Sequence, residues 1–234
     1  MVERPIIFSA PMVRAILAGR KTQTRRIIPA GNVLDDISSE AAEDLELRGW
    51  ETFRRTDDAL FAAKLRYAAG DLLWVRETWA PVNDDGDRWI DYRATPRFPG
   101  ESDRRAAAWD NALHEAEAIR WRPSIHMPRW ASRITLKVTG VKVERLRDIS
   151  EADAKAEGIY WSERFEGWTS GAGADESCDF HTRLPERSFE KLWERIHGDG
   201  SWDANPWVAA ISFERVPPSH TGQTHATPPD GDGG

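Results

Sequence analysis

The chain has only one cysteine among its 234 residues, Cys178, and this scarcity excludes an internal disulfide or a metal site built from several cysteines. Its histidines are scattered and show no His-Glu-x-x-His spacing, so we predict neither a metal nor another cofactor. No stretch approaches the roughly 18 apolar residues of a membrane span, and the first residues lack the apolar region of a secretory signal. These absences predict a soluble, cytoplasmic protein without a membrane partner.

Acidic residues outnumber basic ones over the whole chain, with 39 Asp and Glu against 32 Lys and Arg. The net charge of −7 and the pI near 5.5 argue against a general nucleic-acid binder, which is usually basic. A local basic cleft for an anionic ligand remains compatible with this balance, and its candidates are Arg14, Arg25, Arg26, Arg120, Arg122, His126, Arg129 and Arg133. The 12 tryptophans indicate either aromatic walls around a groove or core packing alone.

Hydrophobic periodicity and turn residues predict an α+β chain. Ser9 and Pro11 begin a short helix that Gly19 ends, and Ser150 and Gly158 bound another. The other expected elements are an acidic helix over 35–48, a strand after Gly70, a surface helix over 106–119, a strand over 134–143, a helix around 189–198 and a strand over 208–216. We predict a single domain over 1–216 with insertions near 31–66 and 83–125, then a disordered tail over 217–234. Residues 160–183 receive no assignment.

The candidate chemistry lies in the run Gly19-Arg20-Lys21-Thr22-Gln23-Thr24-Arg25-Arg26. An ordinary lysine has a pKa of about 10.4, so a basic Lys21 needs burial or neighbouring positive charges, which the arginines supply. A neutral Lys21 would then take the proton of the Thr24 hydroxyl and make it a nucleophile. A strict strand places these two side chains on opposite faces, so their meeting depends on a bend at Gly19. The alternative is a solvated basic turn that contacts nothing or contacts phosphate.

The same run, followed by the Gly70-Asp71-Leu72-Leu73-Trp74-Val75 strand, resembles the ASCH family. Gly19, Lys21 and Arg26 match the family signature Gly-x-Lys-x-x-Glu-x-Arg, whereas Thr24 replaces its glutamate. The resemblance implies a PUA-like β-barrel with flanking helices. The threonine is similar to the N4-acetylcytidine amidohydrolase branch, which implies Lys21 as base, Thr24 as nucleophile and an assisting glutamate on a later strand. Lys137 stands where that glutamate is expected.

Glu77 is the carboxylate that we predict in its place, at the far end of the strand after Gly70. It would orient Lys21 or protonate the departing amine, and the alternative is a structural ion pair with Arg76 or a nearby arginine. The predicted substrate-binding residues are Ser9, Pro11, Arg26, Trp74 and Arg76.

The predicted function is hydrolysis of the amide of N4-acylated cytosine nucleosides, a small-molecule substrate. The alternative is an RNA-binding or modified-nucleotide-binding module without catalysis, in which Lys21, Arg25 and Arg26 hold phosphate.

Overall fold

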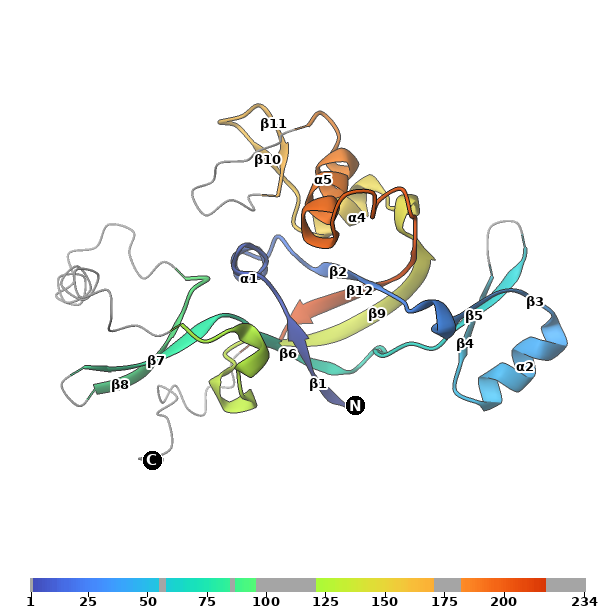
Figure 1. Ribbon diagram of the computed structural model, residues 1–234, viewed down its shortest axis with the longest axis horizontal. Helices are drawn as coiled ribbons and strands as arrows, with labels where there is room; N and C mark the ends of the chain where they lie inside the picture. The colour runs from blue at the N-terminus through green and yellow to red at the C-terminus, as the bar shows by residue number, and fades with distance from the viewer. Residues whose placement is uncertain (1, 55–57, 85–86, 96–120, 171–181, 218–234) are drawn as a thin grey trace. The chain divides into compact units, whose positions relative to one another are not determined.

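The computed structural model describes residues 2–54, 58–84, 87–95, 121–170 and 182–217, with mixed α and β structure (Figure 1). The chain divides into two compact units. Unit 1 comprises Met1–Val2, Ala15–Leu72 and Lys137–Glu214, and unit 2 comprises Glu3–Arg14, Leu73–Leu136 and Arg215–Gly234. No helix in the described ranges has the length and apolar character of a membrane span.

The largest sheet has five strands in the order β1-β6-β9-β12-β2. Their bounds are β1 Glu3–Ile7, β6 Leu72–Arg76, β9 Thr135–Arg145, β12 Trp207–Arg215 and β2 Gln23–Ile27. β2 and β12 are antiparallel, and Thr24 lies opposite Ile211. Across the described ranges the sheet does not close on itself, since β1 and β2 are its two edges. The expected α+β class is confirmed, and the closed PUA-like barrel is not observed in these ranges.

Two helices of unit 1 cover a hydrophobic core. α4 spans Glu151–Ala156 and contacts both β2 and α5, which spans Pro185–His197. The Ser150 hydroxyl accepts a hydrogen bond from the Asp153 amide, which confirms the predicted start of α4. Phe189, Leu192 and Trp193 of α5 are buried as the pattern predicts, with Leu146, Ile149, Ala154, Ile159, Trp202 and Val208.

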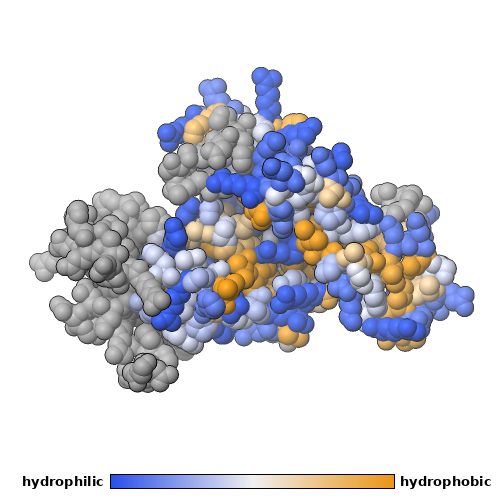
Figure 2. Space-filling model, in the orientation of Figure 1, coloured by the Kyte–Doolittle hydropathy of each residue, from blue (hydrophilic) through white to orange (hydrophobic). Residues whose placement is uncertain are grey.

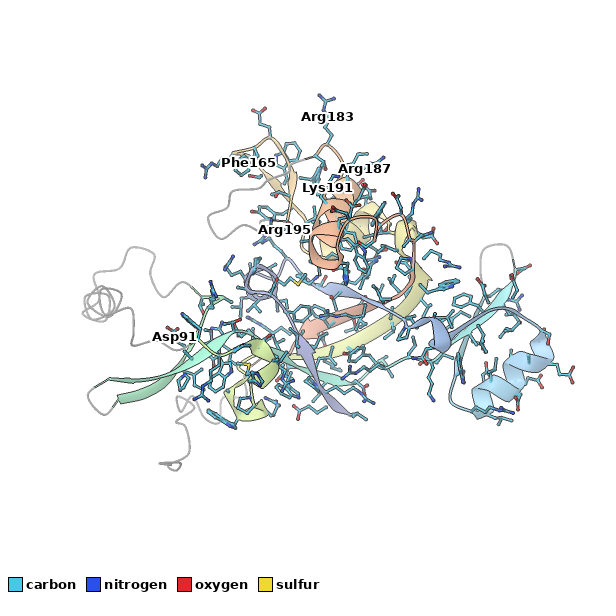
Figure 3. All side chains as sticks on the ribbon, in the orientation of Figure 1. Asp91, Phe165, Arg183, Arg187, Lys191 and Arg195 are labelled. Carbon is cyan, nitrogen blue, oxygen red and sulfur yellow. The ribbon has the colours of Figure 1, made fainter. Side chains whose placement is uncertain are left out.

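The exposed side of α5 differs from the sequence expectation at one position. Ile196 was expected in the buried stripe but is 50% exposed. Arg187, Lys191 and Arg195 recur at four-residue spacing along this exposed side, as Figure 3 shows. Beyond α4, the unassigned stretch contains a hairpin of β10, Tyr160–Ser162, and β11, Gly167–Thr169.

The first insertion of unit 1 forms its own small layer. β3 (Val33–Ile37), β5 (Leu60–Ala63) and β4 (Glu51–Arg54) make a three-stranded sheet in the order β3-β5-β4, and α2 (Ser39–Leu47) packs against β4 and β5. Residues 35–37, expected in the helix, belong to β3 instead, and the Ser38 hydroxyl caps the shorter helix. Figure 2 shows hydrophobic residues on the surface of this layer, where Leu34 and Leu47 are exposed.

Unit 2 has a second small core beneath a hairpin. β7 (Trp79–Asp84) pairs with β8 (Asp87–Tyr92), and Trp79, Ile90, Met127 and Ala131 pack together. Short 3-10 turns at Ser124–His126 and Arg129–Ala131 bring Met127 and Ala131 into this cluster. The expected helix over 106–119 lies outside the described residues, as does all but the first residue of the tail expected over 217–234.

Candidate functional site

Lys21 is positioned by the turn that joins α1 to β2. α1 spans Ala10–Leu17, and the turn that follows it contains Gly19. The φ of Gly19, 73°, is the left-handed conformation that glycine adopts most readily. The Lys21 amide then donates to the Ala15 carbonyl at 3.1 Å, and the Thr22 amide donates to the Ala156 carbonyl at 2.8 Å. The turn is thus fastened to the end of α4, and the Lys21 residue is only 2% exposed.

The carboxylate that meets Lys21 is Glu157, which immediately follows α4. Lys21 Nζ lies 2.6 Å from Glu157 Oε2 and donates a second hydrogen bond to the Glu157 carbonyl at 2.9 Å. Gly158 allows this approach, because a Cβ at that position would lie 3.3 Å from Lys21 Cβ. Its φ of 102° also strongly favours glycine. Glu157 and Gly158, the two residues that follow α4, therefore both contact or closely approach the Lys21 side chain.

The environment of Lys21 lowers its pKa. Burial is the largest cause, because it removes water from the ammonium group, and the positive charges of Arg26 and Arg25 act in the same direction. The ion pair and hydrogen bond with Glu157 oppose this change by stabilising the ammonium form. The predicted direction is therefore confirmed, but burial contributes more than the arginines.

Arg25 joins Lys21 in the same buried network. Its side chain is fully buried, and Nη1 donates to Glu157 Oε1 at 3.2 Å and to Gln23 Oε1 at 2.7 Å. Nη2 lies 2.6 Å from Glu144 Oε1 and 3.3 Å from Asp153 Oδ2. Every one of these partners is a carboxylate or an amide of this chain. Both terminal nitrogens of Arg25 therefore have partners within the chain, and its part in the phosphate-binding alternative stays a prediction.

Asp153 completes the network on the side of α4. Burial opposes its ionisation, but the Ser150 hydrogen bond, the Arg25 charge and the Gln23 hydrogen bond together lower the pKa of its carboxyl group. The exposed Lys142 adds a further ion pair to Glu144 at 2.6 Å. Cations and carboxylates thus alternate from the surface at Lys142 to the buried Lys21.

Thr24 is buried in β2, at 3% exposed, and adjoins this network along the chain. Strand alternation places its side chain on the opposite face from Gln23 and Arg25, together with Arg26. Lys21 Nζ donates to the carbonyl and the carboxylate of Glu157, on the side of α4. The burial of Arg26 lowers its pKa, although Tyr67 and Glu157 favour the charged form. The positive charge of Arg26 in turn lowers the pKa of Lys21.

Glu77 belongs to unit 2 and has an arginine partner there. Its carboxylate, in a residue 1% exposed, accepts hydrogen bonds from Arg133 Nε at 2.9 Å and Arg133 Nη2 at 3.0 Å. Burial raises the pKa of Glu77, and Arg133 partly offsets the change. Arg133 also lies over the Tyr92 ring at 3.9 Å. The ion pair named as the alternative is therefore present, with Arg133 rather than Arg76, and a catalytic role for Glu77 stays a prediction.

The other predicted residues have contacts of their own. Arg76 Nε donates to the Met127 carbonyl at 3.0 Å, and its guanidinium lies 5.0 Å from the Trp74 ring centre. The Ser9 carbonyl accepts the Val13 amide in the first turn of α1, which Pro11 also occupies. Their substrate-binding role stays a prediction.

Lys137 lies on the exposed face of β9, where it faces Glu214 at 3.6 Å. The described residues contain no group of three or more His, Cys, Asp or Glu side chains that could hold a metal ion.

Comparison with protein-family models, with curated proteins and with solved structures found no match.

Glu157 is the site residue that the sequence interpretation missed. The signal was present in part, because Ser150 and Gly158 correctly bounded a short helix and Glu157 immediately precedes that glycine. What the pattern did not reveal is that the end of this helix meets the turn before β2, a contact between residues 136 positions apart.

Proposed function

We propose that this chain is an amidohydrolase that cleaves the amide of N4-acylated cytosine nucleosides, with Lys21 as base and Thr24 as nucleophile. The observation that carries the proposal is the burial of Lys21, which lowers its pKa and so favours the neutral amine that a base requires. The resemblance of the Gly19–Arg26 run to the amidohydrolase branch of the ASCH family supplies the substrate class.

The proposed reaction has two halves. The Lys21 amine takes the proton from Thr24 Oγ1 as that oxygen attacks the acyl carbonyl carbon. When the tetrahedral intermediate collapses, the C–N bond breaks, the Lys21 ammonium gives its proton to the leaving amine, and the acyl group stays on Thr24 as an ester. Water, deprotonated by Lys21, then attacks the ester, and the Thr24 oxygen leaves with that proton as the carboxylic acid is released.

Glu157 is the assisting carboxylate in this proposal. Its 2.6 Å contact with Lys21 Nζ orients the amine and stabilises the ammonium group that forms in each half of the reaction. Glu77, which was predicted for this role, remains the rival to be tested beside it.

Cytidine release from N4-acetylcytidine and longer N4-acyl analogues tests the proposal. Thr24→Val and Lys21→Met, which approximately preserve side-chain volume, are expected to lose activity, whereas Thr24→Ser retains part of it. Thr22→Val is the matched control, because the exposed Thr22 lies in the same run two residues earlier. Activity that survives in Thr24→Val would overturn the nucleophile assignment. Loss in Glu157→Gln with retention in Glu77→Gln would assign the assisting carboxylate.

The alternative function, binding of a modified nucleotide or RNA without turnover, is favoured by one observation. The short ion pair with Glu157 stabilises the ammonium form of Lys21, and an ammonium group binds anions but is no base. Fluorescence anisotropy with a labelled single-stranded RNA at two salt concentrations tests this function. Binding that falls steeply with salt, together with no cleavage of any analogue, would replace the hydrolase proposal.

A further inference from the structure

We infer that Arg25 is a positioning residue that shares the Glu157 carboxylate with Lys21 and thereby controls how tightly Glu157 holds the lysine ammonium. The inference concerns the contacts of Lys21 and does not require the hydrolase activity, although its meaning for catalysis rests on the proposed function.

The geometry divides the two oxygens of Glu157 between two cations. Oε2 accepts from Lys21 at 2.6 Å, and Oε1 accepts from Arg25 Nη1 at 3.2 Å. Glu157 is 5% exposed, so little water screens either contact. A carboxylate that serves two buried cations stabilises each of them less than it would stabilise one alone.

Arg25 is held in place from the opposite side. Glu144 contacts Nη2 at 2.6 Å, Asp153 contacts it at 3.3 Å, and the Phe189 ring centre lies 5.7 Å from the guanidinium carbon. These contacts hold the planar guanidinium of Arg25 in position, so that Glu144, Asp153 and Phe189 help to set the distance between Arg25 and Glu157. Lys142, at the exposed end, contacts Glu144 and Asp153. No ion pair between Lys142 and Glu157 is found within the described ranges.

Replacement of Arg25 by a neutral residue should therefore raise the pKa of Lys21 in two ways. The direct repulsion from a nearby positive charge disappears, and Glu157 becomes free to pair with Lys21 alone. Both effects favour the ammonium form. Glu157 and Arg26 also act on the charge of Lys21, and the replacement of Arg25 leaves both of these residues in the chain.

The experiment follows the titration of Lys21 by NMR in protein that carries ¹³C at lysine Cε. The Arg25→Met variant is expected to raise the pKa of Lys21 by about one unit or more. Lys142→Met is the matched control, since it removes one positive charge from the same network without touching Glu157, and we expect a much smaller change. Equal changes in the two variants would overturn the inference, because general charge would then explain both.

A second variant separates position from charge and covers the case in which Arg25→Met does not fold. Arg25→Lys keeps the charge but replaces the planar group with one ammonium that cannot hold Glu144 and Glu157 together. An intermediate rise in the pKa of Lys21 is expected, and no change would refute the positioning role. If the protein cleaves N4-acetylcytidine, the acidic limb of its pH–rate profile moves upward by the same amount in each variant. If no cleavage occurs, the NMR titration still decides the inference.

Discussion

The ion pair between Glu77 and Arg133 leads to a quantitative prediction about stability. Replacement of Arg133 by methionine leaves the Glu77 carboxylate, 1% exposed, without the two charged hydrogen bonds at 2.9 and 3.0 Å. Removal of one partner of a fully buried pair costs roughly 3–5 kcal/mol. The Arg133 side chain is itself 26% exposed, so water already weakens the contact, and we expect a loss of about 2–3 kcal/mol in the free energy of unfolding at pH 7.5.

The loss of unfolding free energy in Arg133→Met should grow as the pH rises. Burial already raises the pKa of Glu77 above its ordinary value of 4.5, and loss of Arg133 raises it further. A carboxyl group with a raised pKa in the folded state favours folding when it is protonated, and that contribution disappears as the pH rises through the folded-state pKa. The destabilisation of Arg133→Met should therefore be smallest below pH 4.5 and grow toward neutral pH.

Urea unfolding at pH 4.5 and 7.5, followed by tryptophan fluorescence, measures both quantities. The double variant Glu77→Gln/Arg133→Met removes the ionisable group. It should therefore recover part of the stability at pH 7.5, and its loss of stability relative to the parent chain should no longer increase with pH through the titration of Glu77 in the variant. A loss that is equal at the two pH values would refute the reasoning, as would a loss under about 0.5 kcal/mol, which is the level of an exposed pair.

Three further predictions concern the larger unit. Gly158→Ala should lower the free energy of unfolding by about 1–2 kcal/mol in chemical denaturation, because its φ of 102° strains any residue with a Cβ, and that Cβ would crowd Lys21; an unchanged midpoint would contradict this. Glu157→Gln should lower the pKa of Lys21 in the lysine NMR titration, since the ion pair that stabilises the ammonium is lost, and a rise would contradict the sign. Lys137→Ala should leave stability within about 0.5 kcal/mol in thermal unfolding, because its 3.6 Å contact with Glu214 is exposed, and a larger loss would show that β9 depends on it.

The features that sequence predicted well are those that depend on neighbours along the chain. Gly19 and Gly158 end their helices, Ser150 caps α4, and Ile134, Leu136 and Val138 are buried as alternation requires. Each of these follows from backbone conformations or spacings within a few residues. The start of α2 was misplaced because Asp35 and Asp36 are equally typical of the first turn of a helix. In the structure Leu34 and Ile37 on either side of them pair with β5, so that β3 continues through both aspartates.

The partners of the buried charges could not be predicted in the same way. Lys21 and Arg25 were recognised as close to one another, but their carboxylates come from positions 119 to 136 residues later in the chain. Glu77 was preferred because it follows a clear strand, and only the structure shows that Arg133 occupies its carboxylate. Sequence therefore predicted which groups carry charge, and the fold decides which of them are paired.

The attachment of α4 at both of its ends has a consequence for slow exchange of its amide hydrogens. A helix of six residues would normally open easily, since few hydrogen bonds hold it. Here its first turn carries Asp153, bound to Arg25 and Gln23, and its last residue accepts the Thr22 amide just before Glu157 meets Lys21. Local opening would leave buried charges without partners, so α4 should exchange only together with β2, as one cooperative unit.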